Sequence, residues 1–280
     1  MNIGEVHYKI GWRSKGNFPG HHPSQQPGAG LQFRTHVNLI DAPDPRRFDI
    51  RASIRDPFEQ LKVKVFQQTS SIPVFVVADL SASMNYFGAH HKRDVVADFV
   101  EAISYSAYRT GDTFGFYGCA EKEKPPVQVT PTFNRAAGLD LAQSLRGREP
   151  AGTNASGLSA ASRFVGTKKS LIFLLSDFHL PTAEIEKTMA SLAYHDVVPV
   201  VLWDRHEFER LPNFGLLRIV DPETRQSRLL FMRASLKRRM KENFDRRREE
   251  LTRLFLSHGR EPLFLLDGFR SDEVSRYFLG

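Results

Sequence analysis

The chain has 280 residues, of which 41% are hydrophobic and 25% charged, the composition of an ordinary soluble globular protein. Its single cysteine, Cys119, excludes an internal disulfide framework and fits a reducing compartment. The sequence has no run of about eighteen apolar residues that could span a membrane, and its N-terminus lacks the basic and apolar segments of a secretion signal. We therefore expect a cytoplasmic protein, whose net charge of +7 leaves acidic partners and nucleic acid to be considered.

Residues 1–70 predict an N-terminal extension made partly of loop and partly of strand. The segment 17–30 is rich in Gly, Pro and polar residues, which is typical of a loop. Residues 31–40 alternate weakly between apolar and polar side chains and indicate a strand. We expect residues 71–280 to form the main domain.

From residue 71 onward, short apolar runs alternate with helical patterns. The runs that predict strands are 72–79, 112–120, 170–178 and 197–204, and the segments with a helical period are 93–109, 135–147, 154–166 and 182–196. Strands that alternate with helices form a parallel sheet covered on both faces. The sequence therefore predicts the α/β class, with a doubly wound, mainly parallel sheet.

The last third of the chain has a different pattern. Residues 215–235 contain two strand-like runs around an Asp-Pro turn signal, which predicts a β-hairpin. In the next segment, 233–255, apolar residues recur at spacings of four and seven among many basic ones, which predicts an amphipathic helix. A short strand in "PLFLLDG" and a terminal helix over 271–280 complete the main domain.

Oxygen-bearing side chains follow the predicted strands, and in doubly wound folds ligands bind at the carboxyl ends of strands. Asp79, Ser81 and Ser83 follow the first strand, Thr153 stands at a predicted helix start, and Asp177 ends the third strand. Carboxylates and hydroxyls are hard ligands, which Mg²⁺ prefers, with Mn²⁺ or Ca²⁺ as the alternative cations. Five such ligands leave an octahedral position that a carboxylate of another protein can fill.

This set of residues resembles the metal-ion-dependent adhesion site of von Willebrand factor A-like domains. In that family an Asp-x-Ser-x-Ser motif follows the first strand, a threonine lies on a middle loop, and an aspartate follows the fourth strand. Asp79-x-Ser81-x-Ser83, Thr153 and Asp177 match all five positions in order. The resemblance implies that these residues bind one divalent cation, the aspartates partly through water.

The segment before this motif resembles the bacterial family called domain of unknown function 58. The block "RFDIRASIR" (47–55) is similar to the family's Arg-x-(Ile/Phe)-Asp-(Trp)-x-x-Ser-Ala-Arg block, with Ile50 in place of the usual Trp. The 215–230 hairpin and the "LLDG" strand are also similar to the family's C-terminal half, so the resemblance covers about residues 40–280.

This resemblance implies an accessory role beside a MoxR-type AAA+ ATPase. Such proteins are thought to act as metal-dependent adaptors that mature or remodel a client complex. One branch is linked to methanol dehydrogenase maturation, and the length of this chain fits that branch. Many relatives carry transmembrane helices, whereas we expect no membrane span here.

Two other classes of function fit the sequence less well. Asp79 could be the nucleophile of a phosphatase-like hydrolase, but the acid expected two places later is Ser81, and the chain has neither a Gly-x-Ser-x-Gly elbow nor a phosphate-binding loop. We therefore expect a binding module and not an enzyme. The basic helix 233–255 could bind nucleic acid or an acidic partner, but no recognised nucleic-acid motif accompanies it, which disfavours nucleic acid.

Histidines and the cysteine offer weaker signals. The pairs His21-His22 and His90-His91 lie in polar surroundings and are expected to be exposed loop residues. His90-His91 and His179 are candidates for the rim of the metal site, because they follow its motifs closely in the sequence. Cys119 lies within an apolar strand pattern and is expected to be a buried small hydrophobe.

Overall fold

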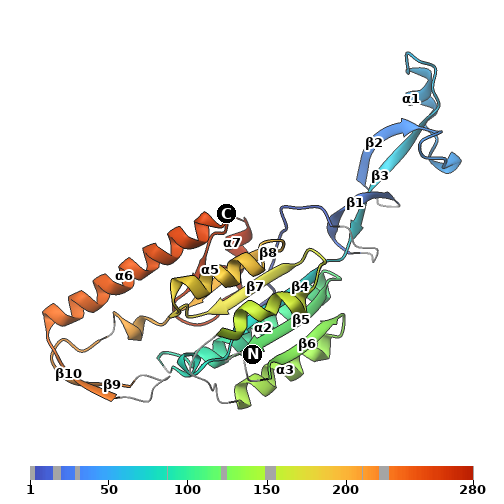
Figure 1. Cartoon of the computed structure of the whole chain (residues 1–280). Coiled ribbons are helices and arrows are strands. Elements are labelled where there is room, and N and C mark those ends of the chain that lie inside the picture. Colours follow the sequence, from blue (N-terminus) through green and yellow to red (C-terminus); the bar gives the residue numbers. More distant parts are fainter. Residues whose placement is uncertain are drawn as a thin grey trace. The chain divides into compact units, whose positions relative to one another are not determined.

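The computed structural model describes residues 4–14, 20–28, 32–86, 88–120, 125–148, 156–209, 211–220 and 227–279 (Figure 1). The chain forms two compact units, one of residues 10–72 and one that joins the first nine residues to 73–280. Residues 4–9, which the sequence assigned to the N-terminal extension, thus belong to the larger unit. Within that unit the backbone N–H of Val6 donates to Ser106 Oγ at 2.8 Å.

The larger unit is built on a six-stranded sheet of order β11-β8-β7-β4-β5-β6. All neighbours pair in parallel except β5 and β6, which are antiparallel. The bounds are β4 Pro73–Asp79, β5 Thr113–Cys119, β6 Val127–Thr132, β7 Leu171–Ser176, β8 Asp196–Leu202 and β11 Leu263–Leu265. Strand β6 was not predicted from the sequence, because its side chains are all at least partly exposed and give no buried apolar run.

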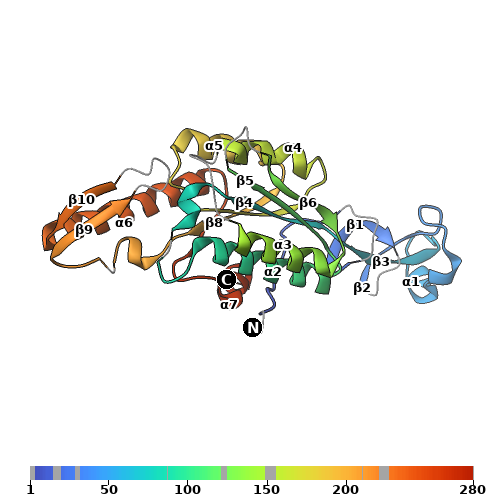
Figure 2. The same cartoon turned by 90° about the horizontal axis from the view of Figure 1, so that it is seen from below.

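Helices cover both faces of this sheet (Figure 2). Helices α2, α3 and α7 lie on one face, and α4 and α5 lie on the other. Their bounds are α2 Lys92–Arg109, α3 Arg135–Gly147, α4 Ala161–Val165, α5 Thr182–Ser191 and α7 Ser271–Leu279. The predicted doubly wound α/β class is confirmed. The helix expected over 154–166 is instead a 3₁₀ turn, Ser156–Ala160, followed by α4, and its first two residues lie outside the described residues.

The predicted hairpin and basic helix are both present. Strands β9, Gly215–Val220, and β10, Ser227–Met232, pair antiparallel, and the turn between them lies outside the described residues. Helix α6, Ala234–Ser257, has only Leu251 and Phe255 fully buried among its described side chains. Its N-terminal end follows the hairpin at a distance from the sheet (Figure 1), and its two buried residues lie in its C-terminal half, which therefore anchors it to the core.

The smaller unit is a three-stranded antiparallel sheet of order β1-β3-β2, with a short helix α1, Ile50–Ile54. Its strands are β1 His22–Gly28, β2 Gln32–Asn38 and β3 Lys62–Ser70. The expected strand over 31–40 is confirmed as β2. The prediction of a loop over 17–30 is wrong where the chain forms β1. This strand accommodates Pro23 and Pro27 because it lies at the edge of the sheet and its register shifts between the two prolines.

Every helix in the described part of the chain is too short or too polar to cross a bilayer.

Candidate metal-binding site

The candidate site lies where β4 and β7 end side by side. Asp79 is the last residue of β4 and Ser176 the last of β7, and the preceding residues of the two strands pair in register. Both side chains are fully buried, and Ser176 Oγ donates a hydrogen bond to Asp79 Oδ2 at 2.8 Å. The parallel sheet therefore brings the carboxyl ends of both strands to one place, as the sequence predicted.

The loop after β4 turns its two serines toward each other. The backbone N–H of Ser81 donates to Asp79 Oδ1 at 2.8 Å, which folds the loop back over the strand end. Ser81 then begins a 3₁₀ turn, and its Oγ lies 3.1 Å from Ser83 Oγ. The Ser83 hydroxyl also lies close enough to the Asp177 carboxylate to help lower its pKa. Asp79, Ser81, Ser83 and Asp177 thus form one connected group of oxygen ligands.

A strained turn directs Asp177 into this group. Phe178 has a φ of +51°, a left-handed conformation that costs a bulky side chain about 1–3 kcal/mol. The buried Phe178 ring packs edge-on against Phe255 of α6, with 5.0 Å between ring centroids. The turn is held further because Asp177 Oδ1 accepts the N–H of His179 at 3.1 Å and its carbonyl accepts Trp203 Nε1 at 2.9 Å. The surrounding packing therefore maintains a conformation that the turn alone would not favour.

Lys92 also reaches this group, which the sequence analysis missed. It is the first residue of α2 and only 4% exposed, and its Nζ lies 3.4 Å from Asp177 Oδ2 and 2.6 Å from Glu207 Oε1. A lysine in the first helical turn lies at the positive end of the helix dipole, which is unfavourable unless an anion compensates. That unusual position was the signal in the sequence that could have identified Lys92.

The charges of these residues shift one another's pKa values. Burial and the negative charge of Asp177 raise the pKa of Asp79 to about 6, although hydrogen bonds from Ser81 and Ser176 oppose the rise. Burial is the largest influence on Asp177 and acts against its ionisation, but the charges of Lys92 and His179, together with hydrogen bonds to the carboxylate, lower the pKa of that carboxyl. Without a further cation, Asp79 is therefore the poorly compensated acid of the site.

The donor set fits a small divalent cation. Asp79, Asp177 and Glu207 against Lys92 leave a formal charge of −2 when all are ionised, which one divalent ion would neutralise. Among the residues that the structure describes, no three His, Cys, Asp or Glu side chains form a metal-binding group, so the site depends on the serine hydroxyls. Thr153, the fifth predicted ligand, lies outside the described residues.

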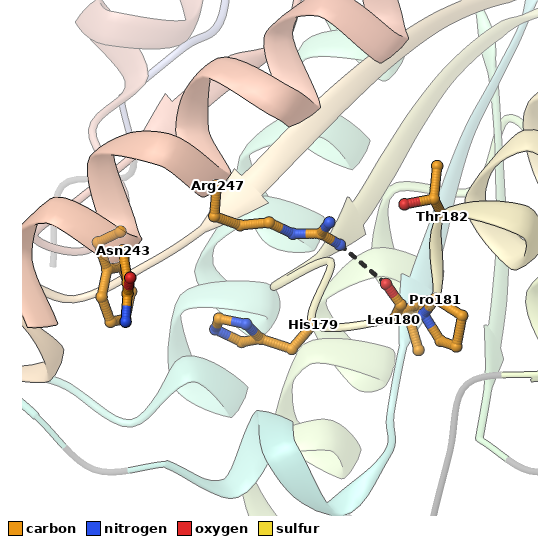
Figure 3. Close-up of a pocket in the computed structure, with 7 residues that line it drawn as sticks. His179, Leu180, Pro181, Thr182, Asn243 and Arg247 are labelled. Carbon is orange, nitrogen blue, oxygen red and sulfur yellow. Dashed lines mark hydrogen bonds between the residues drawn. The ribbon is translucent and has the colours of Figure 1, made fainter.

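An open hollow of about 560 Å³ borders the turn that follows Asp177 (Figure 3). Arg247 of α6 crosses one side of it, and its Nη2 donates to the carbonyls of Phe178 at 2.9 Å and Leu180 at 2.8 Å. His179 lines the same hollow, with its ring stacked on Trp203 at 6.1 Å between centroids. Helix α6 is thus linked directly to the turn that positions Asp177.

The prediction that both histidine pairs are exposed loop residues holds for only one residue of each pair. His21 and His90 are exposed, but His91 is only partly exposed and His22 is 7% exposed within β1. His22 is buried because the segment that was expected to be a loop pairs with β3. Cys119 is 4% exposed, and burial raises the pKa of its thiol, so its interpretation as a buried small hydrophobe is confirmed.

The fold and the polar strand ends define an α/β domain with a candidate cation site at the carboxyl edge of its sheet. The profile of the family described as "Protein of unknown function DUF58" matches residues 43–250, and the chain belongs to this family. A relative from Paracoccus denitrificans, "Uncharacterized protein in moxR 3'region", is 29% identical over 96 residues, which are 34% of this chain and 91% of that protein.

Two solved structures show distant likenesses. The pilus adhesin SpaC from Lactobacillus rhamnosus GG has 13% sequence identity and a TM-score of 0.44, over 75% of this chain and 29% of that chain. The conserved hypothetical protein BatB from Bacteroides thetaiotaomicron has 10% identity and a TM-score of 0.41, over 75% of this chain and all of that chain (100%).

Proposed function

We propose that this protein is a metal-dependent protein–protein interaction module, an adaptor of a MoxR-type AAA+ ATPase that acts in maturing or remodelling a client complex. The observation that carries the proposal is the largely buried group of Asp79, Ser81, Ser83 and Asp177, whose negative charge a divalent cation would balance. Family membership and the relative in a moxR 3' region support the choice of partner. A methanol dehydrogenase client and a cytoplasmic location belong to the same proposal.

In this proposal the serine hydroxyls bind Mg²⁺ directly and the two aspartates bind it directly or through water. When bound, the ion supplies an open octahedral position for a Glu or Asp carboxylate of the partner. The chain's own residues position the ligands: Ser176 and the Ser81 N–H hold Asp79, and the His179 N–H holds Asp177. The protein binds and orients its partner, and it performs no chemical step.

The test is capture of a purified MoxR-type ATPase by the immobilised chain, in magnesium and in EDTA. We expect capture by wild type in magnesium only, and loss of capture by Ser81→Ala/Ser83→Ala in both conditions. The matched control is Ser162→Ala/Ser191→Ala, because within the described residues both of those hydroxyls bond only to carbonyls of nearby residues, at 3.3 and 2.8 Å. Capture by all three proteins that is as strong in EDTA as in magnesium would contradict the proposal.

A second candidate function rests on the hairpin and α6. The outer face of the hairpin carries four exposed apolar side chains, Phe214, Leu216, Leu229 and Phe231, at 76%, 69%, 64% and 48% exposure. The adjoining first turns of α6 are basic, with Lys237, Arg238, Arg239 and Lys241. Exposed apolar groups beside a basic surface favour an acidic protein segment. Capture through this surface would persist in EDTA, weaken in high salt and be lost in Leu216→Ser/Phe231→Ser.

A further inference from the structure

The position beside Asp177 already holds a cation that belongs to the protein. The Lys92 ammonium contacts Asp177 Oδ2 at 3.4 Å, and its side chain is only 5% exposed. Its aliphatic stem enters from the start of α2, and the ring of Tyr86 lies 5.4 Å from Nζ, which adds a cation–π contact. The ammonium is therefore buried within the group of ligands and is not exposed to solvent.

Glu207 holds the ammonium from the other side. Its Oε1 lies 2.6 Å from Lys92 Nζ, closer than the oxygen of Asp177, and its side chain is 10% exposed. Its second oxygen, Oε2, is buried and has no hydrogen-bond partner among the residues that the structure describes. A lysine ammonium has three donors, so Glu207 has an unused acceptor that could take the donor now directed at Asp177.

We propose that Lys92 is an internal counter-ion of the metal site, shared between Asp177 and Glu207, and that it sets the affinity for the divalent cation by competing for Asp177. This inference rests on the proposed function of the site. Two cations on one carboxylate repel each other, and in a buried environment that repulsion is strong. Binding of the divalent ion therefore requires the ammonium to turn from Asp177 toward Glu207.

The competition predicts opposite effects for the two partners of the ion pair. Lys92→Met removes the competing ammonium while keeping an apolar stem of similar length, so the affinity for Mg²⁺ should rise about tenfold or more. Glu207→Gln leaves the ammonium with Asp177 as its one carboxylate partner among the described residues, so the affinity should fall by about tenfold. If the ion pair had only a structural role, the two variants would change the affinity for Mg²⁺ in the same direction, because both would disturb the same packing.

The experiment is isothermal titration calorimetry of the full chain with MgCl₂ and, separately, with MnCl₂. The control is Arg146→Met, because Arg146 is also shared by two carboxylates, Asp98 at 2.6 Å and Glu101 at 2.8 Å, and should leave metal affinity unchanged. Should Lys92→Met fail to fold, the double variant Lys92→Met/Glu207→Gln keeps the site at −2 without an ammonium, and it should bind metal more tightly than wild type.

The results separate the two proposals. The order Lys92→Met, then wild type, then Glu207→Gln, from tightest to weakest, supports the inference. Binding that is equal in the three proteins, or an inverted order, overturns the role of Lys92 and leaves the metal site standing. An absence of binding in every protein overturns the metal site, and the inference falls with it.

Discussion

Replacement of Asp79 by Asn should stabilise the metal-free protein. The pKa of Asp79 rises from an ordinary 3.8 to about 6, so keeping this carboxyl ionised at neutral pH costs roughly 3 kcal/mol. Asn removes that cost. Its single amide oxygen cannot accept hydrogen bonds from both the Ser81 N–H and the Ser176 hydroxyl as the carboxylate does, and the lost hydrogen bond costs about 1 kcal/mol. We therefore expect Asp79→Asn to unfold with a free energy about 2 kcal/mol higher than wild type in EDTA.

The pH dependence has a definite sign. Because the folded-state pKa of Asp79 lies above its unfolded value, the folded protein takes up a proton as the pH falls through about 6. Metal-free wild type should gain stability from this group between pH 7 and pH 4, and Asp79→Asn should not show that gain. Urea unfolding followed by circular dichroism, at pH 7.5 and at pH 5 in EDTA, measures both quantities.

Magnesium should reverse the order of the two proteins. A ligand that binds only the folded state adds stability by mass action, and wild type keeps the carboxylate that the ion needs. Unfolding midpoints in MgCl₂ should therefore rise for wild type and stay unchanged for Asp79→Asn. The reasoning is refuted if Asp79→Asn is less stable than wild type in EDTA, or if magnesium stabilises both proteins equally.

Three further variants test the packing of the larger unit. Tyr8→Phe removes the 2.6 Å hydrogen bond from Tyr8 to Asp112 and should cost about 1–3 kcal/mol in urea unfolding at pH 8. Burial raises the pKa of Tyr8 well above its ordinary value, so the stability that Tyr8 contributes is present below pH 10 and is lost as the pH rises above it. The free energy of unfolding of wild type should therefore fall above pH 10, whereas that of Tyr8→Phe should not fall for this reason. A Cβ at Gly138 would lie 2.2 Å from the Ser104 Cβ, so Gly138→Ala should lower the unfolding midpoint, and adding Ser104→Gly should restore part of it. Arg247→Met should speed hydrogen exchange in the turn after Asp177, because two carbonyls lose their donor.

The sheet and the first half of the site could be predicted because the signals are local. A buried apolar run followed by Asp79, Ser81 and Ser83 shows both the strand and the loop that leaves it. The carboxyl ends of parallel strands meet at one edge of a sheet, so the sequence alone predicts that Asp177 lies near Asp79. Strand β6 could not be predicted in this way, because its side chains face partly into solvent and leave no apolar period.

The second half of the site depends on contacts between distant parts of the chain. Lys92 and Glu207 are 115 positions apart, and neither belongs to a recognisable motif, so only the fold shows that they form an ion pair at 2.6 Å. The strain at Phe178 is equally invisible in the sequence, because nothing in its neighbours demands a positive φ. Strand β1 was hidden for a different reason, since its prolines suggest a loop and only edge pairing accommodates them.

The central claim is that one divalent cation binds at the carboxyl edge of the sheet, and anomalous diffraction tests it most directly. Crystals of the chain grown in MnCl₂ should show an anomalous peak at about 2 Å from the hydroxyl oxygens of Ser81 and Ser83. The peak should be absent from crystals of Ser81→Ala/Ser83→Ala grown under the same conditions. A wild-type map with no peak at these hydroxyls, or with its strongest peak elsewhere on the chain, would contradict the account.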